Sequence, residues 1–316
     1  MKAIAKQISE GLSSRYTAGE ISALTRIIAT ELLGVSQMAY FLKDDVTLTA
    51  EQETLLDNAI ERLKKQEPIQ YILGYCDFCG LRFKVTPATL IPRPETSELV
   101  EWIASEAIGK ESILDIGTGS GCIAVSLAHK LSQSKVTAWD ISTDALAVAA
   151  ENSKANGQAV TFEQVDILAY QPTSEQFDII VSNPPYIKEN EKEAMHSNVL
   201  DWEPHTALFV PDSDPLLFYR TIAEKGLVLL KPGGRLYFEI NRAHGKETME
   251  MLESLGYTSI ELRKDFAEND RMIRAVKPKV KGESSCKRMG GNLFTHAMSE
   301  AEVQAHEVRL KVKSER

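Results

Sequence analysis

Short apolar runs alternate with amphipathic segments along most of the chain, and this alternation predicts its main elements. Apolar strands that alternate with helices form parallel sheets covered by helices on both faces. We therefore expect an α/β protein with a doubly wound, mostly parallel, seven-stranded sheet. The predicted strands are 112–116, 135–139, 160–165, 177–182, 234–240, 258–262 and 272–276, and the predicted helices lie near 121–131, 143–156, 214–230 and 245–255.

The first seventy residues follow a helical period instead. Thr17 stands three residues before Glu20, and Thr49 stands three before Gln52, so both pairs have the spacing of a capping box. Apolar residues at helical spacing follow each pair. We predict a small helical domain over residues 1–70.

The pattern then changes to short β-type runs, of which Leu81-Arg82-Phe83-Lys84-Val85 is one, interrupted by Gly80 and Pro87. Short strands around a glycine turn are typical of a β-hairpin. We therefore expect a hairpin linker at 71–92, followed by the sheet domain at 93–276.

The composition is that of an ordinary globular protein, with 43% apolar and 26% charged residues among 316. No apolar run approaches the ~20 residues that span a bilayer, and residues 1–8 lack a signal-peptide pattern. Four cysteines are too few for a disulfide framework, which fits a reducing compartment. We expect a cytoplasmic monomer with no membrane contact.

The net charge of −9 argues against binding that is dominated by nucleic-acid phosphates, so no stable nucleic-acid complex is expected.

The charge is unevenly distributed, because residues 277–316 carry nine Lys and Arg against five Glu. This segment has a net charge of +4, which leaves −13 on the rest of the chain. Ser299 and Glu302 have the spacing of a helix cap, but the apolar face behind them is thin. We predict a basic, flexible C-terminal extension, with contact to RNA as the alternative.

Candidate chemistry begins at the turn Gly117-Thr118-Gly119-Ser120-Gly121, which follows a predicted strand and opens a helix. Glycines let the backbone approach a nucleotide closely, and the helix directs its positive end to the same place. Asp140 ends the next strand, where a carboxylate can accept both hydroxyls of a ribose. Asp166 follows the third strand and is placed to accept from an adenine amino group.

The same loop distinguishes between two cofactors. Asp115, just before the glycines, suits a cationic amino-acid head group, which S-adenosylmethionine has and NAD lacks. The glycine spacing is G-x-G-x-G, with Cys122 where the dinucleotide fingerprint has its last glycine. Both features favour S-adenosylmethionine.

The tetrapeptide Asn183-Pro184-Pro185-Tyr186 directly follows the predicted strand 177–182. Its prolines fix φ and remove backbone donors, so the Asn183 side-chain oxygen and the Pro184 carbonyl are left to accept from an incoming NH2. Tyr186 offers a face on which a flat group can stack. The motif therefore indicates a clamp for a planar NH2 group, in either a protein amide or a nucleic-acid base.

Four motifs together resemble a known family. In chain order they are Ile91-Pro92-Arg93-Pro94-Glu95-Thr96, Asp115-Ile116-Gly117-Thr118-Gly119-Ser120-Gly121, Asn183-Pro184-Pro185-Tyr186-Ile187 and Glu203-Pro204 with Ala207-Leu208. Over residues 1–276 the chain resembles the class I S-adenosylmethionine-dependent methyltransferases and, within them, the bacterial peptide chain release factor glutamine N5-methyltransferases.

This resemblance implies a Rossmann-like methyltransferase sheet, with S-adenosylmethionine as cofactor and S-adenosylhomocysteine as product. It implies that the substrate is the glutamine of a Gly-Gly-Gln loop in class 1 release factors, which the helical domain helps to grip. The family usually has an aromatic residue packing near the adenine after the third-strand acid, whereas Ile167 and Leu168 follow Asp166 here.

Site residues can now be assigned from the patterns and the resemblance together. The expected cofactor-binding residues are Asp115, Gly117, Thr118, Gly119, Ser120, Gly121, Asp140, Ile141, Asp166, Ile167 and Asn183. The expected catalytic residues are Asn183, Pro184 and Tyr186, and the expected substrate-binding residues are these three with Pro185, Arg93 and Glu95. Instead of binding substrate, Arg93 and Glu95 could form a surface ion pair with each other. Glu203 could equally be a residue of a loop or of a helix start.

Other functions stay open. A methyltransferase of DNA adenine or of an rRNA base would present the same two N–H donors to the clamp, after flipping its base. A non-catalytic adaptor and an NAD-dependent oxidoreductase are further alternatives.

Cysteines and histidines give no metal site. Cys76 and Cys79 lack two further ligands nearby, and the six histidines show no metalloenzyme spacing, so packing explains them best and no metal is expected. Cys122, at a helix start, has either a lowered pKa or a simple packing role, and we favour packing.

Overall fold

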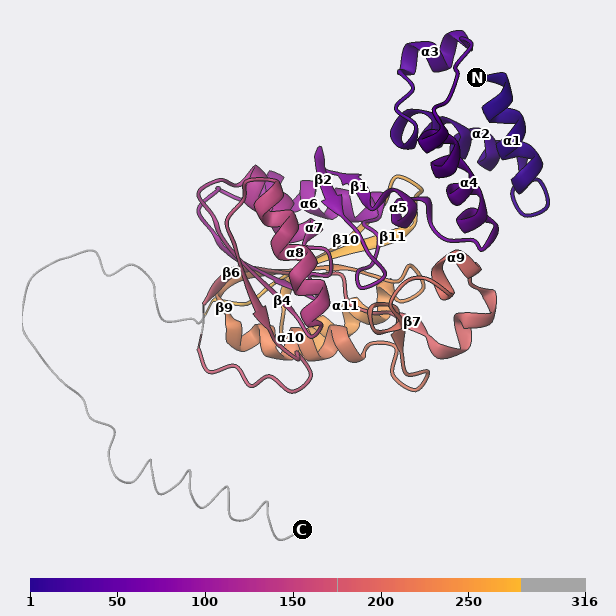
Figure 1. Cartoon of the computed structure of the whole chain (residues 1–316). Helices are drawn as coiled ribbons and strands as arrows, with labels where there is room; N and C mark the ends of the chain where they lie inside the picture. The colour runs from indigo at the N-terminus through magenta and orange to yellow at the C-terminus, as the bar shows by residue number, and fades with distance from the viewer. Residues whose placement is uncertain (175, 280–316) are drawn as a thin grey trace, which may run out of the picture. The chain divides into compact units, whose positions relative to one another are not determined.

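A seven-stranded sheet lies at the centre of the computed structural model, which describes residues 1–174 and 176–279 (Figure 1). Its strands are β3 (Ser112–Ile116), β4 (Lys135–Asp140), β5 (Val160–Gln164), β6 (Phe177–Ser182), β9 (Leu230–Glu239), β10 (Thr258–Lys264) and β11 (Asp270–Val276). The order across the sheet is β10-β11-β9-β6-β3-β4-β5. Only β11 runs antiparallel to its neighbours in this described sheet, so the mostly parallel, seven-stranded sheet is confirmed.

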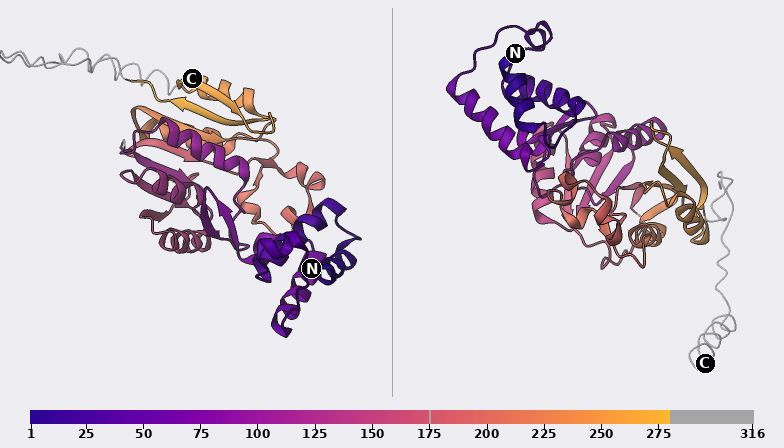
Figure 2. Two further views of the ribbon diagram at one scale, coloured as in Figure 1. Left: turned by 90° about the horizontal axis from the view of Figure 1, so that it is seen from above. Right: turned by 90° about the vertical axis from the view of Figure 1, so that its right-hand side faces the viewer.

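Helices cover both faces of the sheet (Figures 1 and 2). One face carries α6 (Pro94–Glu106), α7 (Cys122–Lys130) and α8 (Thr143–Ala155), and the other carries α10 (Leu217–Leu229) and α11 (Gly245–Ser254). Along β3, Ile113 packs in the core beneath α6 and α7, whereas Leu114 packs in the core beneath α10. Burial on both faces is the reason that the strands read as continuous apolar runs.

The bounds of the sheet strands and of the helices predicted between them differ from the prediction by one or two residues at several ends, and by three or four residues at two. Strand β9 begins at Leu230 rather than at 234, because Lys231-Pro232-Gly233-Gly234 looks like a turn in sequence but is part of the strand, beside a register shift in its pairing with β6. Helix α10 begins at Leu217 rather than at 214, after a turn in which the Leu217 amide donates to the Asp214 carbonyl at 3.2 Å.

The segment between β6 and α10 contains short elements that the sequence pattern did not predict. They are β7 (Ile187–Lys188), η2 (Glu189–Ala194), α9 (Ser197–Leu200), η3 (His205–Ala207) and β8 (Phe209–Val210). Elements of two to six residues are too short to show a period. Trp202 in this segment donates from Nε1 to the Lys65 carbonyl, at 3.2 Å, and so joins it to the end of an N-terminal helix.

The N-terminal helices pack around a core of their own. They are α1 (Lys2–Leu12), α2 (Ala18–Ile27), a π-helical turn η1 (Ile28–Leu32), α3 (Gln37–Leu42), α4 (Ala50–Lys64) and α5 (Ile69–Leu73). Ile8, Leu12 and Leu56 are fully buried among them. Both predicted capping boxes are confirmed, at Thr17 and at Thr49.

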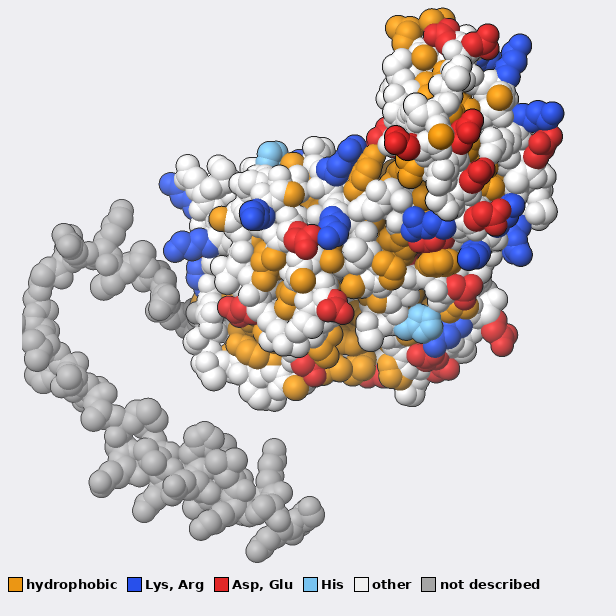
Figure 3. Space-filling view, in the orientation of Figure 1, with side chains coloured by type: hydrophobic (Ala, Val, Ile, Leu, Met, Phe, Trp, Pro, Cys, Tyr) orange, Lys and Arg blue, Asp and Glu red, His pale blue; other side chains and the backbone are white. Residues whose placement is uncertain are grey.

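Helix α3 leaves a hydrophobic surface exposed. Met38, Phe41 and Leu42 are each about two thirds exposed, at 68%, 68% and 65%. Figure 3 shows the hydrophobic side chains gathered at this end of the helical cluster. Large apolar side chains that gather on a surface are typical of an interaction site.

A hairpin links the helices to the sheet domain, as predicted, although α5 occupies the first residues assigned to it. Its strands are β1 (Tyr75–Phe78) and β2 (Leu81–Lys84). Cys79 and Gly80 form the turn, with φ of 49° and 77°. Positive φ at both central residues is the geometry of a tight hairpin turn, so Cys79 has a structural explanation.

No helix within the described ranges is long and apolar enough to cross a bilayer. The predicted C-terminal extension lies, from residue 280 onward, outside the described residues.

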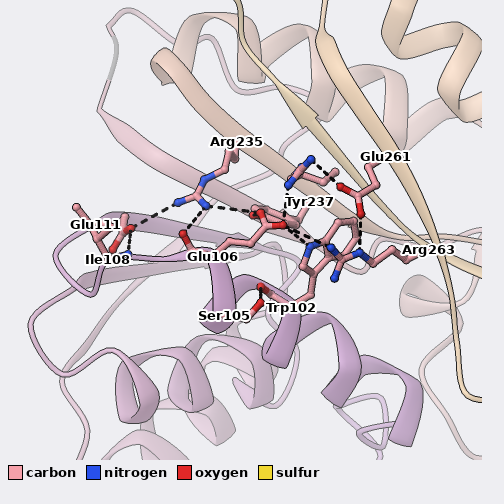
Figure 4. A network of polar contacts seen from close by, with 10 residues as sticks. Trp102, Ser105, Glu106, Ile108, Glu111, Arg235, Tyr237, Glu261 and Arg263 are labelled. Carbon is pink, nitrogen blue, oxygen red and sulfur yellow. Dashed lines mark hydrogen bonds and ion pairs between the residues drawn. The ribbon is translucent and has the colours of Figure 1, made fainter.

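The C-terminal end of α6 is fastened to the sheet by a polar network around Glu106 (Figure 4). The Glu106 carboxylate accepts hydrogen bonds from Trp102 Nε1 at 2.7 Å, from the Tyr237 hydroxyl at 2.7 Å and from Arg274 at 2.6 Å. Arg235 and Arg263 lie 3.7 and 3.6 Å from the same carboxylate. One acidic group therefore holds three arginines from β9, β10 and β11 against the helix.

Replacing Glu106 by glutamine is expected to lower the free energy of unfolding by about 2–3 kcal/mol, because three crowded arginines lose their common counter-charge. Burial alone would raise the pKa of Glu106, but hydrogen bonds from Arg274, Tyr237 and Trp102 outweigh it and lower the pKa. Its contribution is therefore present above the unfolded-state pKa and is lost as the pH falls through the lowered one. The difference between wild type and variant should shrink in acid.

The matched control is Glu101→Gln on the same helix, where an exposed carboxylate pairs with Lys130 at 2.7 Å. This variant should change the free energy of unfolding by less than about 0.5 kcal/mol. Urea denaturation of both variants measures the difference. Equal effects would contradict the special position of Glu106.

Candidate active site

The carboxyl ends of β3, β4 and β6 meet at one edge of the sheet and border a cavity of about 380 Å³. Open α/β sheets bind ligands at this edge, and the volume is that of a small-molecule site. Of the predicted site residues, the cavity is lined by Gly117, Gly119, Asp140, Ile141, Asp166, Ile167, Asn183, Pro184 and Pro185. Thr118 and Ser120 instead line a small adjoining cavity with Arg93 and Asn183.

The glycine loop has the backbone geometry that only glycine adopts easily. Gly119 has a φ of 56°, and a Cβ added there would enter open space beside the cavity. Gly121 has a φ of 79°, and a Cβ there would lie 3.0 Å from the Cβ of Ala149 on α8. Gly119 thus leaves room for a ligand, and Gly121 allows the helices α7 and α8 to approach each other.

Asp115 is buried behind the loop and does not line the cavity. Its Oδ2 accepts from the Thr118 hydroxyl at 2.6 Å and from the Ala124 amide at 3.2 Å, so it holds the loop in place. Burial raises the pKa of Asp115 to about 7. Its Oδ1 has no partner among the described residues, so contact with a cofactor head group stays a prediction.

Asp140 lies at the cavity wall and organises two backbone turns. Its Oδ2 accepts from the Gly119 amide at 2.8 Å, and its Oδ1 accepts from the Ser142 amide at 2.9 Å. Burial raises the pKa of Asp140. The carboxylate therefore joins the end of β4 to the glycine loop at the cavity wall.

Hydrophobic side chains form the other wall beyond Asp140. Ile141 and Leu168 are 56% and 43% exposed although both are large and apolar. Asp166 lines the same cavity, and its Oδ1 accepts from the Leu168 amide at 2.8 Å. Two exposed aliphatic residues near a carboxylate make this part of the cavity wall largely apolar, with one acidic group.

The clamp motif leaves β6 at a point where its two acceptors are available. The side chain of Asn183 makes no hydrogen bond with any described residue, and the Pro184 carbonyl accepts none either. Ser182 fixes the strand end by donating to the Ile116 carbonyl at 2.7 Å. The carbonyl of Tyr186 accepts from Asn241, at 3.3 Å. The motif is thus held from both sides, with its acceptors free.

A second cavity, of about 420 Å³, begins where the first one ends. Leu90, Asn183 and Ala207 line both, so the Asn183 side chain stands at their junction. The second cavity is lined further by Arg93, Glu95, Tyr186, His196, Glu239 and Arg271, among others. Burial raises the pKa of Tyr186, so its ring carries a neutral phenol.

Arg93 forms an ion pair, but with Glu203 rather than with Glu95, so the alternative of an Arg93–Glu95 surface pair is wrong. The Arg93 guanidinium donates to Glu203 Oε1 at 2.5 Å, and the Ile91 amide donates to Oε2 at 3.2 Å. Glu203 is 4% exposed. It ties the segment before α6 to the segment before η3, and residues of both segments line the first cavity.

Sequence reasoning missed several lining residues. Glu239 and Arg271 border the second cavity, and Phe218 and Leu90 border the first. Glu239 had one available signal, since it is a carboxylate at the end of an apolar strand, like Asp140 at the end of β4.

His196 lines the second cavity and Cys122 lines the small adjoining one, but neither is placed as a metal ligand among the described residues. Burial raises the pKa of the Cys122 thiol. The alternative of a lowered pKa at the helix start is therefore wrong, and a packing role is favoured. No group of three or more potential metal ligands occurs among the described residues.

Two family models match the chain. Residues 5–74 match the PrmC N-terminal domain, and residues 95–201 match the Methyltransferase small domain. The first range corresponds to α1–α5, and the second runs from α6 through the clamp motif.

Proteins of similar sequence carry one common name, release factor glutamine methyltransferase. The one from Bacteroides thetaiotaomicron is 49% identical over 278 residues, which cover 87% of this chain and 99% of that protein. That from Flavobacterium psychrophilum is 46% identical and covers 85% of this chain and 96% of its own. That from Streptococcus pneumoniae is 40% identical, with 76% and 86% covered.

Proposed function

The chain belongs to the release factor glutamine methyltransferase family, and from this premise we propose that it methylates the side-chain amide nitrogen (N5) of the glutamine in the Gly-Gly-Gln motif of class 1 peptide chain release factors. The observation that carries the proposal is the pair of available acceptors, Asn183 Oδ1 and the Pro184 carbonyl, at the junction of two cavities. Such a pair fits the two N–H groups of a primary amide.

The first cavity fits S-adenosylmethionine as the cofactor, with S-adenosylhomocysteine as the proposed product. When bound, it supplies an electrophilic methyl group on a sulfonium. Asp140 would accept the ribose hydroxyls, Ile141 and Leu168 would enclose the adenine, and Asp166 would accept from its amino group. The partnerless Oδ1 of Asp115 and Oγ of Ser120, both buried beside the glycine loop, support a polar head group nearby.

The clamp acts by orientation and by charge. An amide nitrogen is a weak nucleophile because its lone pair is delocalised, so alignment provides much of the rate. Asn183 and Pro184 would each accept one N–H, which directs the lone pair toward the first cavity. The same two oxygens stabilise the positive charge that develops on nitrogen, while Tyr186 stacks on the amide plane.

Residues 1–70 are proposed to be the substrate-recognition domain. The exposed Met38, Phe41 and Leu42 of α3 support this, because they present an apolar surface to a protein partner. An enzyme of translation factors acts where translation occurs, so we propose that it works in the cytoplasm. We also propose that it acts as a monomer and forms no stable nucleic-acid complex.

The amide substrate is favoured over a base of DNA or rRNA, because the relatives are all named release factor glutamine methyltransferase. Their similarity to this chain covers 76–87% of it. The free acceptors also disfavour a non-catalytic adaptor, and the glycine spacing disfavours NAD.

Methyl transfer tests the proposal directly. Labelled S-adenosylmethionine is incubated with the protein and either a Gly-Gly-Gln release factor, its Gln→Ala variant, DNA or rRNA. Label should appear in the unmodified factor alone. Label in nucleic acid, or in the Gln→Ala factor, would refute the assignment.

A further inference from the structure

Glu239 is a buried carboxylate beside the clamp to which neither the sequence nor the proposed reaction gives a role. It ends β9 and is 2% exposed. Ser182, the last residue of β6, pairs with Phe238 of β9, and Asn183 and Glu239 each directly follow one member of this pair. Adjacent strands lie roughly 4.8 Å apart.

Glu239 lies on the face of the sheet that α6 and α7 cover, and Asn183 follows β6 two residues after Val181, which lies on the same face. Tyr237 and Val181, two residues before Glu239 and Asn183, both pack in the core beneath α6 and α7. Side chains two apart along a strand share a face. Glu239 and Asn183 line the second cavity together, so both reach the space where the acceptor amide would lie.

One oxygen of Glu239 is engaged and the other is available. Oε2 accepts from the Thr96 hydroxyl of α6 at 2.6 Å. Oε1 accepts no hydrogen bond from any described residue. It is also not fully enclosed by protein atoms. Thr96 therefore fixes the carboxylate while Oε1 remains available toward the cavity.

Several charged or titratable groups surround Glu239. Burial raises its pKa to about 7, Thr96 and Arg271 lower it, Glu95 raises it and Arg93 lowers it. Tyr186, Tyr219 and Cys122 also interact with it electrostatically, and His196 lines the same cavity. Arg271 is already paired with Asp265 at 2.9 Å, and Arg93 with Glu203, so neither is a dedicated partner of Glu239.

The proposed reaction leaves one proton to remove, because a methylated primary amide nitrogen holds one hydrogen too many. Asn183 and Pro184 offer neutral carbonyl oxygens, which are too weakly basic to keep it. We propose that Glu239 is the base that receives this proton at Oε1, directly or across one water. The N–H bond breaks with its electron pair left on nitrogen, an O–H bond forms, and no further reactant is needed.

This inference rests on the proposed function, and the pH dependence of kcat tests it. With saturating S-adenosylmethionine and a Gly-Gly-Gln release factor, wild-type kcat should rise as the pH passes through about 7, because the base must be ionised. Glu239→Gln should lower kcat by about 10²-fold and abolish the inflection. Glu239→Asp should keep the inflection at a reduced rate.

Thr96→Val is the matched control, because it removes the hydrogen bond and keeps the carboxylate. Since that bond lowers the pKa of Glu239, the inflection should move to higher pH. Cofactor affinity should be unchanged in Glu239→Gln, because Glu239 does not line the first cavity, and this reports correct folding.

A wild-type pH profile in Glu239→Gln, or a kcat within about twofold of wild type, would overturn the role of Glu239 and leave the proposed function intact. If Glu239→Gln does not fold, loss of the inflection in Glu239→Asp would overturn it equally. Absence of methyl transfer by the wild type would instead overturn the proposed function, and this inference with it.

Discussion

Asn183→Ala is expected to lower kcat for release factor methylation by about 10³-fold, while the Kd for S-adenosylmethionine changes by less than about fivefold. The side chain of Asn183 has no hydrogen bond to lose within the described structure, so its removal should cost little stability. What disappears is an acceptor at the junction of the two cavities. Single-turnover kinetics and a cofactor titration separate the two quantities.

Two further variants define what Asn183 supplies. Asn183→Asp keeps an oxygen acceptor and should retain more activity than the alanine variant. Asn190→Ala removes an exposed asparagine a few residues away, in η2, and should leave kcat unchanged. Near-normal turnover in Asn183→Ala would remove the clamp from the mechanism.

Asp140→Ala should raise the Kd for S-adenosylmethionine by about 10²-fold, because the proposed charged acceptor of the two ribose hydroxyls is lost. The same change frees the Gly119 and Ser142 amides, which loosens the glycine loop. Since Asp140 does not line the second cavity, kcat at saturating cofactor should stay within a few-fold of wild type. Calorimetric titration measures the affinity, and steady-state kinetics measure kcat.

Asp144→Ala provides the control, because Asp144 is an exposed carboxylate in the first turn of α8, four residues further along. Its Kd should match that of the wild type. A weak effect of Asp140→Ala, comparable with this control, would place the ribose elsewhere.

The features that the sequence predicted well are local ones. The glycine loop follows β3 within a few residues, and the acceptors of Asn183 and Pro184 adjoin the end of β6. The strands were recognisable because burial on both faces makes them continuously apolar. Proline and glycine at 231–234 hid the start of β9, since a strand that tolerates them has the composition of a turn.

The features that could not be predicted depend on distant partners. Glu203 holds Arg93 across 110 residues, and Thr96 holds Glu239 across 143. Nothing in the local spacing of either carboxylate announces its partner. Asp115 illustrates the opposite case, because its position was evident whereas its engagement by Thr118 and Ala124 followed from the fold of the loop itself.

Helix α6 connects two of these distant features. Its thirteen residues form a rod of about 20 Å, whose last turn is fastened by Glu106 and whose first turn carries Thr96. Because a helix is stiff, a small rotation of α6 at its Glu106 end also moves its Thr96 end. Thr96 donates a hydrogen bond to the Glu239 carboxylate, so this rotation would reorient that carboxylate. If Glu239 acts as proposed, substitutions among the arginines around Glu106 would change the rate of methyl transfer as well as the stability, although none of these arginines lines either cavity.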